Sequence, residues 1–254
     1  MSVSVRIVAD AAAVGDAAAE LVIAGLGVRD APVLGVATGS SPLPVYAALE
    51  RRGPAGRLGL GRAPAPAPGE YVGRPADHPE SYRSVVDREV TTRLGLDPSR
   101  VAVPDGTAED LGAACRRYEA ALRAAGGVDV QILGIGSNGH IGFNEPGTPA
   151  DSRTRVAELM PSTRNDNARY FPSLADVPER CITQGIGTIL EARSIVLVAS
   201  GEAKADAVAR AVSGTPDPTC PASALQAHPR VTFVLDTAAA SLLDPARHGD
   251  HALH

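Results

Sequence analysis

A histidine set among glycines is the side chain of this sequence best suited to proton transfer. His140 lies in LGIGSNGHIGFNEPGT (residues 133–148), directly after the apolar run VDVQI. Glycines let a backbone bend tightly at the carboxyl end of a strand, where open α/β sheets place their ligands. Glu145 follows His140 by five residues, and a carboxylate near an imidazole fixes its tautomer and raises its basicity. With Asn138 and Asn144 close by, the pattern indicates a general acid or base rather than a packing residue.

A stretch suited to an anion follows an earlier apolar run. ATGSSP (residues 37–42) comes after VLGVA and opens a helix, where hydroxyls and amides meet a partial positive charge that favours a phosphate. The same letters would also suit an ordinary helix N-cap, because Ser-Pro is common at a helix start. Arg169, in the polar and lid-like segment NDNARYF, and Lys204, in ASGEAKA, would neutralise two phosphate charges. Each cation alone would be more typical of a solvated surface.

The composition favours a small-molecule ligand. The 254 residues carry a formal net charge of −5 and no run of lysines or arginines, which argues against nucleic acid and against an anionic membrane. Cys115, Cys181 and Cys220 are odd in number and widely spaced, which argues against a disulfide framework or a zinc site. No stretch approaches the roughly 20 apolar residues of a membrane span, and the start lacks the features of a signal peptide. We therefore expect a cytoplasmic protein.

Apolar runs of strand length alternate with helical segments along the chain. The runs are continuous in Val, Ile and Leu, as is typical of strands buried on both faces: VSVRIV, PVLGVAT, VDVQILGIG, SIVLVAS and VTFVLD. Between them, EDLGAACRRYEAALRAAGG has apolar residues at helical spacing, with Cys115 on the inner face. The alternation predicts one α/β domain over residues 1–240, with a mostly parallel sheet and helices on both faces. We expect residues 241–254, which end in RHGDHALH, to be a disordered tail rather than a metal site.

A run of alternating prolines stands where another strand is due. Residues 63–68 read APAPAP, and proline lacks the amide hydrogen that a central strand needs. The run is therefore either a connector between two domains, over residues 57–68, or a broken strand. The helix and strand rhythm continues on both sides with the same composition, which favours the broken strand.

The chain as a whole resembles the glucosamine-6-phosphate deaminases, within a wider family that also holds 6-phosphogluconolactonases. The resemblance runs to about Asp236 and is carried by ATGSSP, EYVGRPADHPESY, GIGSNGHIGFNEPGT, DSRTRV, ARYF, ITQGIGTI, SGEAK and PASALQAHP. GHIGFNEPG together with SRTR is specific to the deaminases, since the lactonases lack the NEPG continuation. The resemblance implies a modified Rossmann-type α/β domain, a homo-oligomer, a sugar phosphate as the small-molecule partner, and neither a metal nor an organic cofactor.

The resemblance also implies roles for single residues. His140 would open the pyranose ring, oriented by Glu145, and Asn138 occupies a position that is aspartate in some members and asparagine in others. The residues that would bind the substrate phosphate are Thr38, Gly39, Ser40, Ser41, Arg169 and Lys204.

One departure from the family touches the reaction itself. The family pattern is an apolar strand that ends in Asp-Glu-Tyr, and its aspartate moves a proton from C2 to C1 of the open-chain sugar. This chain has Gly69, Glu70 and Tyr71 there, so both the base and the strand that would hold it are expected to be missing. A placed base contributes typically about a hundred- to ten-thousandfold in rate. Glu70 is one position off, and adjacent side chains of a strand face opposite ways, so only a rearranged backbone would make it the base.

Three functions are open at this point. We favour dehydration of N-acetylglucosamine 6-phosphate, in which His140 or Glu70 removes the C2 proton and the C3 hydroxyl leaves. An amide nitrogen cannot depart as ammonia by the usual route, and Gly69 removes bulk and charge beside C2. The second function is glucosamine-6-phosphate deamination, with Glu70 or a water replacing the lost carboxylate. The third is a non-catalytic sensor of an amino-sugar phosphate, which the retained His140 and Glu145 disfavour.

Overall fold

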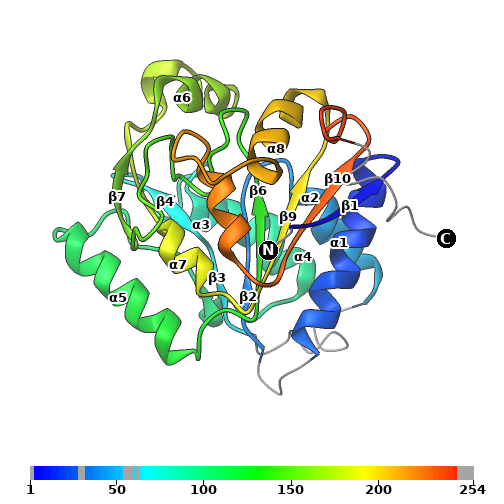
Figure 1. The fold of residues 1–254 in the computed structure, drawn as a ribbon. Coiled ribbons are helices and arrows are strands. Elements are labelled where there is room, and N and C mark those ends of the chain that lie inside the picture. The colour runs from blue at the N-terminus through cyan, green and yellow to red at the C-terminus, as the bar shows by residue number, and fades with distance from the viewer. Residues whose placement is uncertain (1–2, 28–31, 54–59, 61–62, 245–254) are drawn as a thin grey trace.

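Five parallel strands form the centre of the protein. The computed structural model describes residues 3–27, 32–53, 60 and 63–244, and the strand order is β1-β10-β9-β6-β2 (Figure 1). The bounds of these strands are β1 Ser4–Val8, β2 Leu34–Gly35, β6 Val130–Gly134, β9 Ser194–Ala199 and β10 Val231–Asp236. Each strand falls on one of the apolar runs, so the predicted parallel sheet is confirmed.

Helices cover both faces of the sheet (Figure 1). Their bounds are α1 Ala11–Leu26, α2 Leu43–Arg51, α3 Tyr82–Val86, α4 Thr92–Leu94, α5 Leu111–Ala124, α6 Pro161–Asn167, α7 Ile186–Leu190 and α8 Ala205–Val212. Val196 and Val198 of β9 pack in the apolar cluster that holds α1 and α2, whereas Ile195 and Leu197 pack in the cluster that holds α7 and α8. Apolar residues are thus needed at every position of a central strand, which explains the continuous runs.

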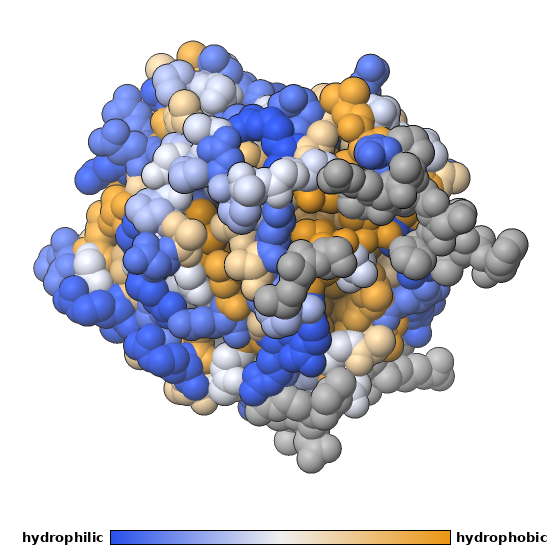
Figure 2. All heavy atoms as spheres, viewed as in Figure 1, coloured by the Kyte–Doolittle hydropathy of each residue, from blue (hydrophilic) through white to orange (hydrophobic). Residues whose placement is uncertain are grey.

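Helix α5 shows how the outer layer is built. Asp110 caps its first turn by accepting a hydrogen bond from the amide of Ala113 at 2.8 Å. Cys115, Tyr118 and Leu122 face inward and are buried, while hydrophilic side chains cover the outer side of the helix (Figure 2). The prediction that Cys115 is a core residue is confirmed.

The proline-rich run forms a strand. Ala65–Pro66 is β3, which pairs in parallel with β5, Val101–Ala102. The amides of Leu34 and Val36 donate to the carbonyls of Pro64 and Pro66 at 3.0 and 2.9 Å, so β3 also extends the central sheet beyond β2. The alternative prediction, a connector between two domains, is therefore wrong for residues 63–68. The expectation that the strand is missing is also wrong. Residues 57–59, 61 and 62 of the predicted connector lie outside the described residues.

The alternation of proline and alanine explains how this strand is tolerated. In a parallel strand the amide and carbonyl of one residue point to the same side. The prolines face β2 and the alanines face β5, where the amide of Ala67 donates to the carbonyl of Ala102 at 2.8 Å. Only the β2 side therefore loses donors. On that side Pro68 has no amide hydrogen to donate to the carbonyl of Val36. The side-chain amide of Gln131 donates to this carbonyl instead, at 3.4 Å.

A second, antiparallel sheet begins directly after this strand. The chain bends at Pro68 and continues as β4, Gly69–Tyr71, which pairs with β8, Arg180–Thr183, and β8 pairs with β7, Arg155–Glu158. The predicted strand is thus broken into two short pieces that belong to two sheets. Gly69 lies at the junction between the sheets.

Residues 241–244 do not behave as the tail that we expected from residue 241 onward. Leu243 is buried, and its amide donates to the carbonyl of Ala240 at 2.9 Å. The remainder of the predicted tail, residues 245–254, lies outside the described residues. None of the helices in the described part of the chain is long and apolar enough to cross a membrane.

Candidate active site

One pocket lies at the carboxyl ends of the parallel strands β2, β6 and β9. The segments that follow β2, β6 and β9 supply most of its wall, and Figure 1 shows α6 and α8 at the same end of the sheet as the tip of the β6 arrow. The residues of our prediction that line it are Thr38, Gly39, Ser40, Ser41, His140, Arg169 and Lys204. Residues more than 160 positions apart in the sequence therefore meet in one site.

A relay of three side chains sets the state of the histidine. The Glu145 carboxylate only accepts hydrogen bonds, so the amide nitrogen of Asn138 faces it, at 2.9 Å. The Asn138 oxygen then faces Nδ1 of His140, at 2.8 Å, and also accepts the backbone amide of His140 at 3.1 Å. Because an amide oxygen cannot donate, Nδ1 carries the proton and Nε2 is left with a lone pair.

This relay corrects one detail of the expected site. Glu145 lies 3.8 Å from Nδ1 of His140, beyond hydrogen-bond distance, and acts on the imidazole through Asn138. Burial lowers the pKa of His140, an effect that the Glu145 charge opposes and the Lys204 charge reinforces. A neutral imidazole with a free Nε2 is the form that a general base needs.

The glycines around His140 have identifiable roles. A Cβ at Gly136 would come within 2.2 Å of the His140 ring, and the Gly136 amide donates to the His140 carbonyl at 2.9 Å. The side chain of Asn144 then anchors the turn, because its amide nitrogen donates to the carbonyls of Ile141 and Gln184 at 2.9 and 2.8 Å. The backbone is thus folded tightly under the imidazole.

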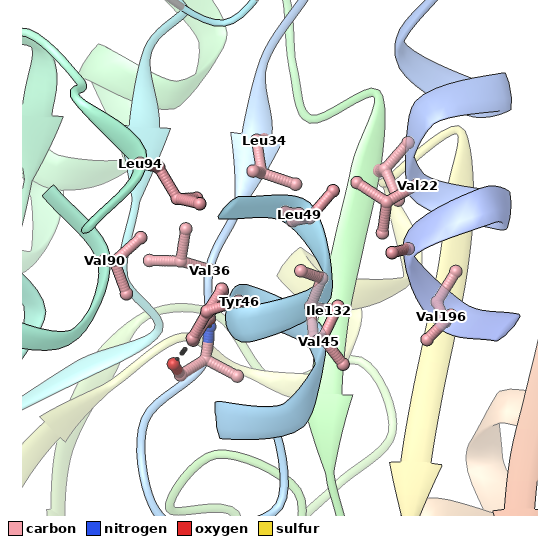
Figure 3. Packing of buried hydrophobic residues seen from close by; sticks show 14 of the residues in the cluster. Val22, Leu34, Val36, Val45, Tyr46, Leu49, Val90, Leu94, Ile132 and Val196 are labelled. Atoms are coloured by element: carbon pink, nitrogen blue, oxygen red, sulfur yellow. Dashed lines mark hydrogen bonds between the residues drawn. The ribbon is translucent and has the colours of Figure 1, made fainter. Parts of the chain in front are cut away.

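The loop after β2 does not cap the helix that follows it. Helix α2 begins after Pro42 without a side-chain cap, so the hydroxyls of Ser40 and Ser41 do not serve as an ordinary N-cap. Gly39, at φ 88°, bends the loop. Its base is fixed by Tyr46, whose hydroxyl donates to the Ala37 carbonyl and accepts the Ala37 amide, both at 2.8 Å (Figure 3). A loop of this kind at a helix N-terminus is suited to binding an anion.

Two cations face this loop from other elements. Lys204 ends a short 3-10 turn before α8, and Gly201, which starts that turn, donates to Asp236 at the end of β10 at 3.1 Å. Burial lowers the pKa of Lys204, and the nearby Arg169 lowers it further, against the opposite effect of Asp166. A bound phosphate would relieve the repulsion between the two cations.

Glu70 is not placed to act as a base. One carboxylate oxygen accepts the backbone amides of Tyr71 and Tyr82 at 2.7 and 2.8 Å, and the other accepts the amide of Arg83 at 2.9 Å. The side chain is buried and holds the first turn of α3, outside the pocket lining. The prediction of a catalytic role for Glu70 is therefore wrong, and its role is structural.

Gly69 lines the pocket, but the direction that a side chain would take from its Cα is occupied. A Cβ at this position would lie 2.7 Å from the carbonyl oxygen of Ile182 and 3.0 Å from the ring of Phe143. Phe143 stacks on Tyr82 with ring centroids 5.2 Å apart, and it fills the volume that a side chain would need. The expectation that Gly69 removes bulk beside the substrate is wrong.

Some lining residues were not found from the sequence. Asp166 is the one carboxylate among the described lining residues, and Ser137 Oγ donates to it at 3.4 Å. It precedes Arg169 by three residues in NDNARYF, which places both on one side of a helical turn, and this spacing is the signal that could have revealed it. Tyr82 and Phe143 gave no comparable signal. No cluster of His, Cys, Asp and Glu in the described part of the chain could hold a metal ion.

Comparisons with known proteins agree with this arrangement. The family described as Glucosamine-6-phosphate isomerases/6-phosphogluconolactonase matches residues 8–234. A glucosamine-6-phosphate deaminase of Streptomyces avermitilis is 55% identical over 97% of this chain and 95% of its own length. A glucosamine-6-phosphate deaminase of Cutibacterium acnes is 52% identical over 96% and 94%.

Solved structures show the same fold. A monomeric glucosamine-6-phosphate deaminase has a TM-score of 0.90 and 40% identity, with 94% of this chain and 99% of that chain covered. The 6-phosphogluconolactonase from Leishmania guyanensis has a TM-score of 0.76 at 22% identity, over 96% and 100%, which bears on the fold alone. The fold and the pocket define an α/β enzyme of the sugar-phosphate class. The chain belongs to the family of glucosamine-6-phosphate isomerases and 6-phosphogluconolactonases.

We predict that the phosphate group is required for ligand binding. Lys204→Ala and Arg169→Ala should each weaken the binding of fructose 6-phosphate by about 1.5–3 kcal/mol, the range for hydrogen bonds to charged groups. Isothermal titration calorimetry measures this, with unphosphorylated fructose as the ligand control and Arg210→Ala, a cation of α8 that does not line the pocket, as the protein control. Equal affinity for fructose and its 6-phosphate would contradict the assignment.

We also predict that His140 is needed for turnover of any sugar phosphate. His140→Gln removes the Nε2 lone pair, so the rate should fall by about a hundredfold or more. Calorimetric affinity for fructose 6-phosphate should stay within a few fold, since the cations are untouched. A variant that keeps full activity would show that the acid–base group lies elsewhere.

Proposed function

We propose that this protein is a glucosamine-6-phosphate deaminase, which converts its substrate and water into fructose 6-phosphate and ammonia. The observation that carries the proposal is that one pocket is lined both by His140, which is oriented by Asn138 and Glu145, and by the anion loop (Thr38–Ser41) with Lys204 and Arg169. Curated relatives that cover nearly the whole chain, at 55% identity in one case, carry this name. A relay of this kind would be superfluous in a sensor.

The relay suits the opening of the sugar ring. With the phosphate held by Lys204 and Arg169, the ring oxygen and the C1 hydroxyl lie toward the histidine end of the pocket. Nε2 of His140 takes the proton of the C1 hydroxyl and returns it to the ring oxygen as the C1–O5 bond breaks. The result is the open-chain aldehyde, and His140 ends in its starting form.

The next step needs a base at C2, and we assign it to Asp166. Its carboxylate takes the C2 proton while the C1 carbonyl oxygen gains a proton from a water molecule and C1=C2 forms. The proton then returns to C1 as the nitrogen lone pair forms C2=N. The hydroxide left by that water adds to C2, and its proton passes to the nitrogen as ammonia leaves and the C2 carbonyl forms. Asp166 lines the same pocket as Gly69, His140 and Lys204, and its charge acts to raise the pKa of both His140 and Lys204. This nearness to both ends of the pocket supports the assignment.

Dehydration of N-acetylglucosamine 6-phosphate, which we favoured from the sequence, is not supported. The relatives that match nearly the whole chain carry the name of the deaminase. The space beside Gly69 that was expected to accept an altered substrate is filled by Phe143. The homo-oligomer and the cytoplasmic location inferred from the sequence stay predictions.

One incubation tests the proposed function. The purified protein is mixed with glucosamine 6-phosphate and, separately, with its N-acetyl form, and products are followed by mass spectrometry and an ammonia assay. We expect fructose 6-phosphate and ammonia from the first and no change in the second. Loss of water from the N-acetyl form would replace the deaminase with a dehydratase, and binding without any product would replace it with a sensor.

Removing the Asp166 carboxylate should slow deamination. Asp166→Asn cannot accept the C2 proton, so ammonia release should fall by about a hundredfold, and exchange of the C2 proton with deuterated water should fall in parallel. Asp176→Asn, an exposed carboxylate ten residues on, is the matched control. If the rate of C2 proton exchange is unchanged in Asp166→Asn, the base that removes the C2 proton is another group, such as His140.

Restoring an aspartate at residue 69 should help little by itself. The new Cβ would press on the Ile182 carbonyl and on Phe143, and a misplacement of about 1 Å costs on the order of a hundredfold. We expect ammonia release by Gly69→Asp to stay within about tenfold of the unchanged protein. Combining it with Phe143→Leu should give a larger gain, with Phe143→Leu alone as control. A hundredfold gain from Gly69→Asp alone would show that this position is unobstructed.

A further inference from the structure

Position 204 is a lysine, although the binding of a phosphate at the anion loop does not require a lysine rather than an arginine. It is the one lysine in the 254-residue sequence, which otherwise uses arginine for its basic side chains. An arginine would also bind a phosphate, and in a fork geometry, but it cannot lose its proton and act as a nucleophile. The chain therefore carries a single side-chain amine, and that amine lies in the pocket.

The surroundings of Lys204 favour its uncharged, nucleophilic form. The side chain is half-buried and lines the same pocket as Arg169 and the Thr38–Ser41 loop. Burial lowers the pKa of the amine, and the Arg169 charge lowers it further. Desolvation next to another cation is a recognised way to activate a lysine.

We propose that Lys204 is a site of acylation by acyl phosphates of small carboxylic acids. The anion loop and Arg169 would bind the phosphate end of the donor, which brings its carbonyl carbon against the lysine amine. The inference rests on the anion subsite of the proposed function.

The transfer balances without a further reactant. The Nζ lone pair attacks the carbonyl carbon, and the bond from that carbon to the phosphate oxygen breaks. Inorganic phosphate leaves with the electron pair, and the Nζ proton passes to water. The acylated lysine has lost its charge and its ability to pair with a phosphate, so the modified protein should no longer bind a sugar phosphate well.

The single lysine makes the test direct. The protein is incubated with acetyl phosphate and digested with trypsin, which cleaves after arginine and unmodified lysine. Acetylated Lys204 leaves the peptide of residues 194–210 uncut, with the mass of one acetyl group added, while unmodified protein gives two shorter peptides. We expect this uncut peptide, and Lys204→Arg should not yield it.

Two further arms test whether the pocket directs the reaction. Inorganic phosphate should protect Lys204 from acetyl phosphate, whereas unphosphorylated N-acetylglucosamine should not. Arg169→Ala should slow labelling by acetyl phosphate by roughly tenfold or more. Labelling by p-nitrophenyl acetate, a donor without a phosphate, should slow distinctly less, because it loses only the effect of Arg169 on the Lys204 pKa. Bound phosphate that gives no protection, or equal slowing with both donors, would overturn the proposal.

The outcome is separable from that of the proposed function. A protein that deaminates glucosamine 6-phosphate but leaves Lys204 unlabelled refutes the acylation alone. A protein in which fructose 6-phosphate neither binds nor protects Lys204 refutes the anion subsite, and with it both proposals. Where labelling occurs, ammonia release should fall in proportion to the fraction of Lys204 that is acetylated.

Discussion

The carboxyl ends of parallel strands meet at one edge of a sheet, and the site of this protein depends on that constraint. β2 ends in the anion loop, β6 ends in the glycine turn that holds His140, and β9 ends in the turn that carries Lys204. No single segment contains the site. It exists because the sheet order places β6 between β2 and β9, so the three segments that follow these strands line one pocket.

Within the site, one acceptor-only carboxylate determines the chemistry. Glu145 fixes which way the Asn138 amide points, and Asn138 fixes which nitrogen of His140 is protonated. The histidine is thus presented as a neutral base by a chain of hydrogen bonds, each of which leaves only one choice for the next. The anion loop and the cations come from other segments, but the Lys204 charge also lowers the pKa of His140, so the binding subsite and the relay are linked by charge.

The sequence predicted those parts of the site whose chemistry is local. His140 with its glycines, the Thr38–Ser41 loop and the five central strands all follow from short patterns. Pairings across the chain could not be predicted in this way. Glu70 is paired with the first turn of α3, and Phe143 fills the space beside Gly69, because contacts distant in sequence decide where each side chain goes. The proline run was correctly predicted to be a broken strand, but the expectation that no strand remains was wrong, since the side on which each missing donor falls depends on the neighbours of the strand.

A crystal structure with fructose 6-phosphate bound would test the central claim most directly. We predict the phosphate oxygens within hydrogen-bond distance of the Thr38–Ser41 amides and of the Lys204 amine, and the C1 end of the sugar against Nε2 of His140. The Asn138 and Glu145 contacts should be unchanged. A phosphate bound outside this loop, or a sugar whose C1 end points away from His140, would contradict the assignment of the pocket.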